Sequence, residues 1–396
     1  MSSFLISTKK KIHSKNIFLL FQSLFFLFLP FSIAPKNVFM GLTVIAGIYY
    51  LIRNRKNFDR FDAATICLAL LFVVQALSSK VAGDSFKDSF SAGRDILKMA
   101  LVFFVVRHIR LSSREICWFS ILPLLISFLI VFVIGFIEFH FLKKTIDGRF
   151  RMMGPVNRSA VYILLMFCVS LSVSILPSCN KIIRGVAFIS ALFASIGILV
   201  AASRSAWAAL IIIAFLFATF QNRYPKIITL IAMVAIISIS LGVAYYIDPN
   251  IMKAKLSGHF HIRLGIWQGG LEYYHNHANK LLGIGTGNYR IIGLSAYTNG
   301  YMKLSTQGHN MFIHFLVENG ILGLFAFIGF FISSYASTLK KRANSNLFFV
   351  ISLLAIVGMF ISCCFHNSLF REFGMLFCII IAISLSQLNA SKAENQ

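Results

Sequence analysis

Long apolar runs separated by short polar segments follow one another along most of the chain. Many of these runs approach the ~20 residues that an α-helix needs to cross about 30 Å of hydrocarbon. The pattern predicts about twelve membrane-spanning helices, the second of which is short enough to be tilted or partly interfacial. We expect them at residues 17–34, 37–52, 62–79, 95–110, 118–142, 158–177, 185–202, 204–220, 226–247, 311–338, 346–364 and 372–388.

Composition predicts the fold class, and the charges of the loops predict the orientation in the membrane. Of the 396 residues, 58% are hydrophobic and 42 are Phe, which is more apolar surface than a soluble core absorbs. We therefore expect an all-α polytopic membrane protein. Alternate loops are basic, so both termini are expected in the cytoplasm, with an uncleaved first helix. The basic loop residues are Lys9, Lys10, Lys11, Lys15, Arg53, Arg55, Lys56, Arg107, Arg110, Arg114, Lys181, Arg184, Arg223, Lys226, Lys340, Lys341 and Arg342.

A long segment, residues 248–308, interrupts the helices on the opposite, outer side. Loops longer than ~12–15 residues are usually functional or disordered, and this one is rich in aromatic residues and not of low complexity. The chain thus divides into nine helices over 1–247, the outer loop over 248–308, and three helices with a short cytoplasmic tail over 309–396. We expect the loop to be ordered and to cap the helix bundle.

An amphipathic helix is predicted within the outer loop. Ile262, Ile266, Trp267 and Leu271 recur at helical spacing, which favours a helix lying along the membrane surface. Arg263 precedes Trp267 by four residues, close enough for the guanidinium to contact the indole. The later "GIGTGN" looks like a phosphate loop, but without a strand before it we interpret it as a tight turn.

Basic residues on the outer side are more numerous than the positive-inside rule allows. They indicate an anionic partner, such as a phosphate or pyrophosphate, or simple attraction to anionic head groups. Arg204, in "VAASRSAW", lies between two apolar runs with almost no loop, so it either meets an anion or snorkels to the interface. The outer cations are Lys143, Lys144, Arg149, Arg151, Arg158, Arg204, Lys253, Lys255, Arg263, Lys280, Arg290 and Lys303.

The stretch "GHNMFIHFLVENGILGL", residues 308–324, places four polar side chains at the start of an apolar helix. Taken as a helix from residue 309, it puts His309 in the first turn and aligns Asn310, His314 and Glu318 on one face. A buried carboxylate must be paired or protonated, so His314 and Glu318 are interpreted as structural support. His309, at the solvent-accessible end, is the candidate general base.

The seven cysteines lie in predicted helices or at their edges, and their spacing is not that of a metal site. We expect these cysteines to be packing residues, and we expect the protein to bind no metal ion. The seven cysteines are Cys67, Cys117, Cys168, Cys179, Cys363, Cys364 and Cys378.

Three motifs, in this order, resemble the O-antigen ligase family: "SRSAW", "RLGIWQGGL…LLGIGTGNY" and "HNMFIHFLVENGILGL". The resemblance spans residues 145–330, and "DGRFRMMGPVNRSA", residues 147–160, is similar to a further segment of that family. The family also includes relatives that transfer glycans to proteins and, more distantly, O-antigen polymerases.

The resemblance implies a GT-C-like glycosyltransferase of the bacterial inner membrane. It would move a glycan from undecaprenyl pyrophosphate to lipid A–core on the periplasmic face, without metal or other cofactor, among membrane lipids and with no nucleic-acid partner. His309 would act as the base, and Arg204 and Arg263 would hold the pyrophosphate. Further donor or acceptor contacts are expected at Arg149, Arg151, Asn157, Arg158, Trp267 and Asn310.

Two kinds of alternative stand beside this interpretation. A polymerase would use a growing glycan as the acceptor, and a protein-targeted relative would use a Ser or Thr. A twelve-span polysaccharide transporter would instead show internal repeats and a site near the bilayer midplane built from broken helices. The sequence shows neither feature clearly.

Overall fold

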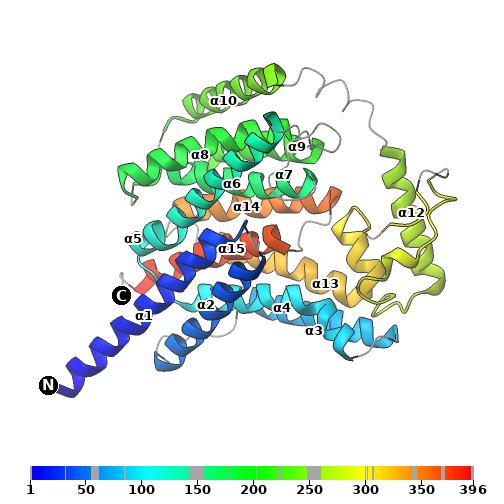
Figure 1. Ribbon diagram of the computed structural model, residues 1–396, viewed down its shortest axis with the longest axis horizontal. Helices are drawn as coiled ribbons and strands as arrows, with labels where there is room; N and C mark the ends of the chain where they lie inside the picture. Colours follow the sequence, from blue (N-terminus) through cyan, green and yellow to red (C-terminus); the bar gives the residue numbers. More distant parts are fainter. Residues whose placement is uncertain are drawn as a thin grey trace.

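The computed structural model is a helical bundle with a compact outer segment at one end (Figure 1). It describes residues 2–31, 33–54, 62–83, 86–141, 156–177, 179–201, 203–221, 224–247, 260–298, 300, 302–305, 307–340, 346–366 and 371–393. Its elements are α1 (Ser2–Phe28), α2 (Ile33–Arg53), α3 (Ala63–Val81), α4 (Phe86–His108), α5 (Ser113–Ile116), the π-helix η2 (Cys117–Ile121), α6 (Leu122–His140), α7 (Val156–Ser174), α8 (Lys181–Val200), α9 (Arg204–Phe220), α10 (Lys226–Ile247), α12 (Phe260–His277), the 3-10 helix η3 (Asn288–Ile291), α13 (Met311–Leu339), α14 (Asn346–Phe365) and α15 (Arg371–Ala393).

The predicted apolar runs are helical, which confirms the all-α class. Among the residues that the structure describes, seven helices are long and apolar enough to cross a membrane, and four shorter apolar helices accompany them. The second run, expected to be short, is one of the seven, with a span over Ala34–Arg53. α4 is not among them, and its first half carries Arg94, Asp95 and Lys98. The chain is thus a multi-pass membrane protein, while the number of twelve spans stays a prediction.

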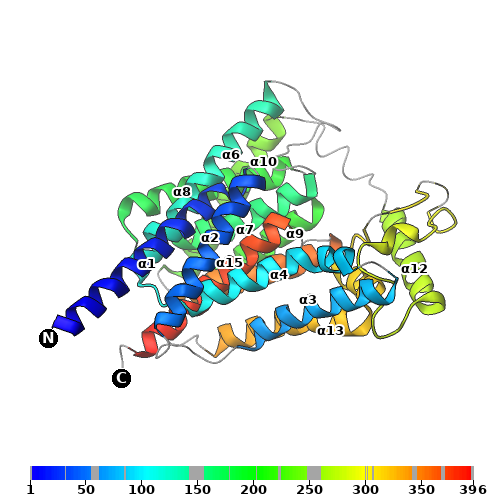
Figure 2. The ribbon, with the colours of Figure 1, turned by 60° about the horizontal axis from the view of Figure 1, so that its bottom comes forward.

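Both chain termini lie at the end of the bundle opposite α12 and the loop that follows it (Figures 1 and 2). The centre of the bundle is packed through aromatic side chains. Phe330 of α13 makes edge-on contacts with Phe103 of α4 and Phe377 of α15, with ring centroids 5.9 Å apart in both pairs. The outermost helix, α10, exposes most of its apolar surface, as a lipid-facing helix does.

One expectation about the cysteines is wrong. Cys117 and Cys179 form a disulfide that joins η2 to the segment before α8. The other five cysteines take part in no disulfide; they are Cys67, Cys168, Cys363, Cys364 and Cys378. The two cysteines are 62 residues apart in the sequence, so the local spacing of cysteines could not predict this disulfide. The bond lies at the end of the bundle that holds the termini, near the ion pair between Lys15 and Glu115.

α13 is not the continuous helix that the sequence predicted. Gly320 has φ 65° and ψ −166°, a backbone region essentially restricted to glycine. The helix is interrupted there, and residues 280–285 of the outer loop fill the interruption. Four backbone hydrogen bonds replace the helical ones: Ile321 N to Lys280 O (3.0 Å), Leu322 N to Leu281 O (3.2 Å), Ile284 N to Val317 O (3.0 Å) and Gly285 N to Glu318 O (3.0 Å).

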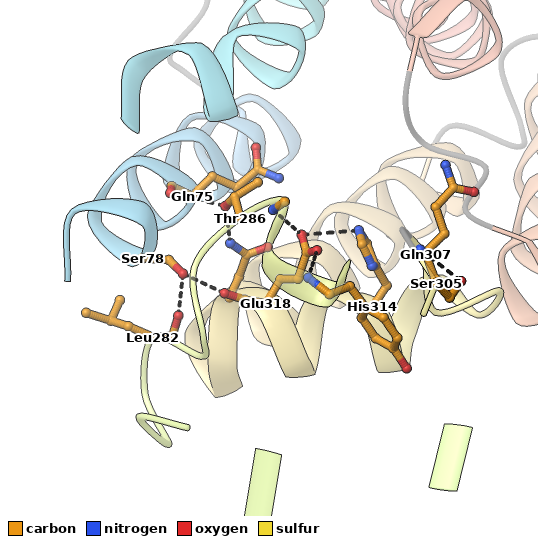
Figure 3. A network of polar contacts seen from close by, with 11 residues as sticks. Gln75, Ser78, Leu282, Thr286, Ser305, Gln307, His314 and Glu318 are labelled. Atoms are coloured by element: carbon orange, nitrogen blue, oxygen red, sulfur yellow. Dashed lines mark hydrogen bonds and ion pairs between the residues drawn. The ribbon is translucent and has the colours of Figure 1, made fainter. Parts of the chain in front are cut away.

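This insertion also fastens α3 to the outer loop. The Ser78 hydroxyl of α3 lies 2.5 Å from the carbonyl oxygens of both Leu282 and Glu318 (Figure 3). Nδ2 of Asn319 donates to Oγ1 of Thr286, at 2.6 Å. The backbone N–H and C=O groups at the break are thus hydrogen-bonded to the outer loop and to Ser78. They are not left open to bind a substrate, as they are in the broken helices of transporters.

Candidate active site

The outer loop has a small apolar core of its own. Ile266, Tyr289, Ile292, Leu294 and Val317 form this cluster, which joins α12 and η3 to the first turns of α13. The face of α12 differs in part from the prediction, because Leu271 is 40% exposed. Glycines complete the buried face instead: a Cβ on Gly265, Gly269 or Gly270 would collide with Tyr297, Leu294 or Tyr289.

Glu318 holds the glycine-rich turn against α13. Its carboxylate accepts the backbone N–H groups of Gly287, at 2.8 Å, and of Tyr289, at 3.0 Å. His314 Nε2 lies 3.4 Å from the same carboxylate, and both side chains are buried (Figure 3). The turn interpretation of "GIGTGN" therefore holds, and the pair of His314 and Glu318 lies inside the protein below the outer surface.

His309 precedes α13, which begins only at Met311, and so does not lie in its first turn as expected. Its φ of 50° is unusual for a residue with a Cβ. Gly308 beside it has little room, since a Cβ there would lie 3.2 Å from the Tyr289 ring and 3.4 Å from His314 Cα. Strained backbone of this kind gathers at functional sites, and here it fixes the direction of the imidazole.

Asn310 is the N-cap of α13 and links it to α14. Its Oδ1 accepts the N–H groups of Phe312, at 2.9 Å, and Ile313, at 3.2 Å, while Nδ2 donates to the carbonyl of Cys364, at 3.0 Å. The helix thus gains a strong cap. Both ends of the amide are engaged in the fold, which argues against the expected substrate contact at Asn310.

His366, directly after α14, is a residue that the sequence reasoning missed. Its Nε2 is hydrogen-bonded to Ser205 Oγ at 2.9 Å and lies 3.5 Å from Ser203 Oγ. All three side chains are buried. A signal was present: His366 follows an apolar run at the same predicted side of the membrane as Arg204 and His309.

Electrostatic coupling brings the predicted arginines and His309 together. Burial lowers the pKa of Arg263, and the charge of Arg204 lowers it further. Burial, with the charge of Arg263 adding to it, lowers the pKa of His309 to about 4. Burial and the charges of Arg263 and His309 lower the pKa of His366 to about 3. Arg204 of α9, Arg263 of α12, His309 just before α13 and His366 just after α14 are therefore linked electrostatically.

Arg204 and Arg263 differ in setting. Arg204 is the first residue of α9 and is exposed, with the buried Ser203 as N-cap. Arg263 is half-buried in the first turn of α12, four residues before the half-buried Trp267. Arg204 was expected to be held at the membrane surface, and its side chain is open to a ligand. The two guanidinium groups come from different parts of the fold, one from the bundle helix α9 and one from α12 of the outer loop.

Four of the expected contact residues cannot be placed. Arg149 and Arg151 lie outside the described residues, and the side chains of Asn157 and Arg158, at the start of α7, are not described. Within the described part, no group of three or more His, Cys, Asp or Glu side chains is placed to hold a metal ion.

The described arrangement suits the chemistry of an anionic leaving group. Guanidinium groups form charge-assisted hydrogen bonds with phosphate oxygens. A histidine with a pKa of about 4 is neutral at physiological pH, so its imidazole can accept a proton. The region thus combines two guanidinium groups that influence each other electrostatically with a neutral imidazole.

Comparison with known proteins identifies this region. A search of the curated proteins found no significant match. Residues 189–328 match the family model described as O-antigen ligase. The matched segment contains Arg204, Arg263 and His309 and ends before His366. Over this segment, which contains the three motifs, the chain is similar to the O-antigen ligase family.

Proposed function

We propose that this protein is a glycosyltransferase that moves a glycan from undecaprenyl pyrophosphate to the lipid A–core oligosaccharide at the periplasmic face of the inner membrane. The observation that carries the proposal is the electrostatic coupling of Arg204, Arg263 and His309. These residues come from three separate parts of the chain, α9, α12 and the segment before α13, so the coupling depends on the fold and not on one motif.

The arginines act on the leaving group. As the bond between the anomeric carbon and the pyrophosphate oxygen breaks, negative charge grows on the pyrophosphate. Arg204 and Arg263 stabilise that charge by donating charge-assisted hydrogen bonds to phosphate oxygens. Burial, and after it the charge of Arg204, lowers the pKa of Arg263, and an anion bound between the two guanidinium groups relieves both costs.

His309 acts on the acceptor. A sugar hydroxyl attacks the anomeric carbon, a new carbon–oxygen bond forms, and the hydroxyl proton passes to the neutral imidazole. Burial, with the charge of Arg263 adding to it, keeps the free imidazole neutral by lowering its pKa. The bound pyrophosphate offsets that positive charge, so the imidazole becomes more basic when the donor is in place.

Two hydrogen-bonded groups position these residues. Glu318 and His314 hold the turn that packs beside His309, through the backbone of Gly287 and Tyr289. His366 holds Ser205, the neighbour of Arg204. Neither group needs to touch a substrate to affect transfer.

The purified protein in liposomes, supplied with an undecaprenyl-pyrophosphate glycan and lipid A–core, tests this function. Arg204→Ala and Arg263→Ala should each abolish transfer at normal protein level, and Arg→Lys should rescue poorly because an ammonium cannot form the two-pronged contact with phosphate. Full activity of both Lys variants would reject the clamp.

Replacing the acceptor separates ligase from the related activities. A polymerase would extend a second lipid-linked glycan, and a protein-targeted enzyme would modify a Ser or Thr peptide. We favour the ligase because the matched family model is the O-antigen ligase model. Transfer to either other acceptor in preference to lipid A–core would reject this choice.

A further inference from the structure

A second polar region lies away from the residues described so far. A cavity of about 470 Å³ opens between α1, α2, α4 and α15, and none of its lining residues belongs to the site around His309. It lies near the C-terminal end of α1 and the N-terminal ends of α2, α4 and α15. These ends face away from the chain termini, toward the side of the molecule that carries α12 (Figures 1 and 2).

The cavity has an apolar floor and a charged rim. Phe25, Met40, Met99 and Met375 supply the floor, and thioether side chains adapt well to flexible apolar ligands. The rim carries three cations and two carboxylates. They are Lys36, Arg94, Lys98, Asp95 and Glu372.

The charges on the rim do not cancel. Lys36 is paired with Glu372. Lys98 lies 3.4 Å from the Asn37 amide oxygen and only loosely near Asp95, at 3.9 Å. Arg94 is exposed and has no ion-pair partner among the described residues. A guanidinium without a carboxylate at the mouth of an apolar cavity is suited to a phosphate.

Apolar residues beside the cavity are open to lipid. Val38, next to Asn37 on α2, is 59% exposed, and Leu101, two residues after Met99 on α4, is 38% exposed. The cavity therefore borders the surface that faces the hydrocarbon. Its ligand can enter from the membrane with an acyl chain toward Met40 and Met99 and an anionic head toward Arg94.

We propose that this cavity binds the phosphorylated head of an acyl lipid, namely the acceptor lipid of the transfer reaction, with a phosphate at Arg94 and Lys98. The assignment rests on the proposed function, which requires two amphiphiles to be held at once. Arg204 and Arg263 take the pyrophosphate of one, and the cavity takes the phosphate of the other.

Lipid titration of the full-length protein in detergent, followed by native mass spectrometry, tests the assignment without any transfer step. The probes are bisphosphorylated lipid A, the same lipid with its phosphates removed, phosphatidylglycerol and inorganic phosphate. Arg94→Gln should weaken lipid A binding about tenfold or more, as the loss of a charge-assisted contact does. Arg290→Gln, which removes the same charge from an exposed outer-loop residue, is the matched control.

Each outcome decides between occupants. Tight binding of bisphosphorylated lipid A that depends on Arg94 and is lost with the dephosphorylated lipid supports the assignment. Equal affinity for phosphatidylglycerol, or displacement of lipid A by inorganic phosphate at similar concentration, overturns it, as does an unchanged affinity in Arg94→Gln. A protein that binds lipid A in this way yet transfers no glycan contradicts the proposed function and not the lipid site.

Discussion

His366 Nε2 and Ser205 Oγ lie 2.9 Å apart and join the end of α14 to the first turn of α9. Ser205 follows Arg204 directly, so this hydrogen bond fixes the backbone from which one guanidinium of the clamp extends. The same end of α14 accepts a hydrogen bond from Asn310 through the carbonyl of Cys364. A single helix end therefore sets the positions of both Arg204 and His309.

His366→Ala should raise the KM for the donor by up to about tenfold, because a net hydrogen bond of ~0.5–1.5 kcal/mol is lost. His366→Asn should recover much of the loss, since an amide can also bond to the Ser205 hydroxyl. The measurement is the separate determination of KM and kcat for both variants.

His108→Ala is the matched control, because His108 is also buried and bonded at 2.8 Å to the Phe104 carbonyl, near the other end of the bundle. If His366→Ala and His108→Ala lower activity alike, and only in step with protein yield, then His366 is merely a packing residue.

Gly320→Ala should strongly destabilise the protein. A Cβ at this position would lie 2.3 Å from the Leu281 carbonyl oxygen, and the backbone has a conformation that alanine avoids. We expect a loss well above the ~1–2 kcal/mol that left-handed backbone alone costs an L-residue. The melting temperature in detergent is the measurement. Gly287→Ala, at φ 84° in the ordinary left-handed region and with nothing within 4 Å of the added Cβ, shows what a positive φ costs without a collision.

Equal melting temperatures for the two glycine variants would mean that the loop over 280–285 does not occupy the break in α13. The inserted loop would then make only a weak contact with α13. The claim that it anchors the turn beside His309 would be wrong.

The orientation in the membrane is open to chemical labelling. Cysteines placed at Ser295, in the outer loop, and at Lys340, at the end of α13, are both at exposed positions. In a cysteine-free background, an impermeant thiol reagent should label Ser295→Cys from the periplasm and leave Lys340→Cys unlabelled. The reverse pattern would place the proposed site in the cytoplasm.

The pair of Cys117 and Cys179 reports on orientation independently. It lies at the end of the bundle assigned to the cytoplasm, where disulfides are rare. With that orientation the two cysteines should be reduced in cells, so a thiol reagent present while the cells are denatured should alkylate both of these buried residues. A disulfide that persists in cells would contradict the assignment and agree with the reverse labelling pattern.

The helices were predictable because each depends on a local property, the length of an apolar run. The spacing of four residues also predicted that Glu318 and His314 share one face, where the structure has them 3.4 Å apart. Their supporting role stays a prediction. The break at Gly320 had a local signal that was not used: "NG" within "VENGIL" is a strong turn dipeptide.

The remaining features depend on contacts between distant parts of the chain. Ser205 and His366 are 161 residues apart, and the two bonded cysteines are 62 apart. Periodicity carries no information about such pairs. The pKa of His309 could not be foreseen either, because it depends on burial and on Arg263 of another helix; the ordinary value of ~6.5 was the natural expectation.

That lowered pKa predicts an unusual pH dependence. A general base must be unprotonated, so transfer is full above the pKa of His309 and is lost as pH falls through it. In the free enzyme this pKa is about 4, and it should rise when donor pyrophosphate offsets the charge of Arg263. The acid limb of kcat/KM for the donor should therefore lie at lower pH than the acid limb of kcat.

The initial rate of His309→Gln across this pH range is the measurement that tests the central claim most directly. Glutamine keeps a hydrogen bond but cannot accept a proton, so the variant should transfer glycan about 10²–10⁴-fold more slowly than the native enzyme, with the acid limb gone. Donor binding should be nearly unchanged, and His314→Ala should act mainly through protein yield. Transfer by His309→Gln at the native rate, with the acid limb in place, would contradict the account.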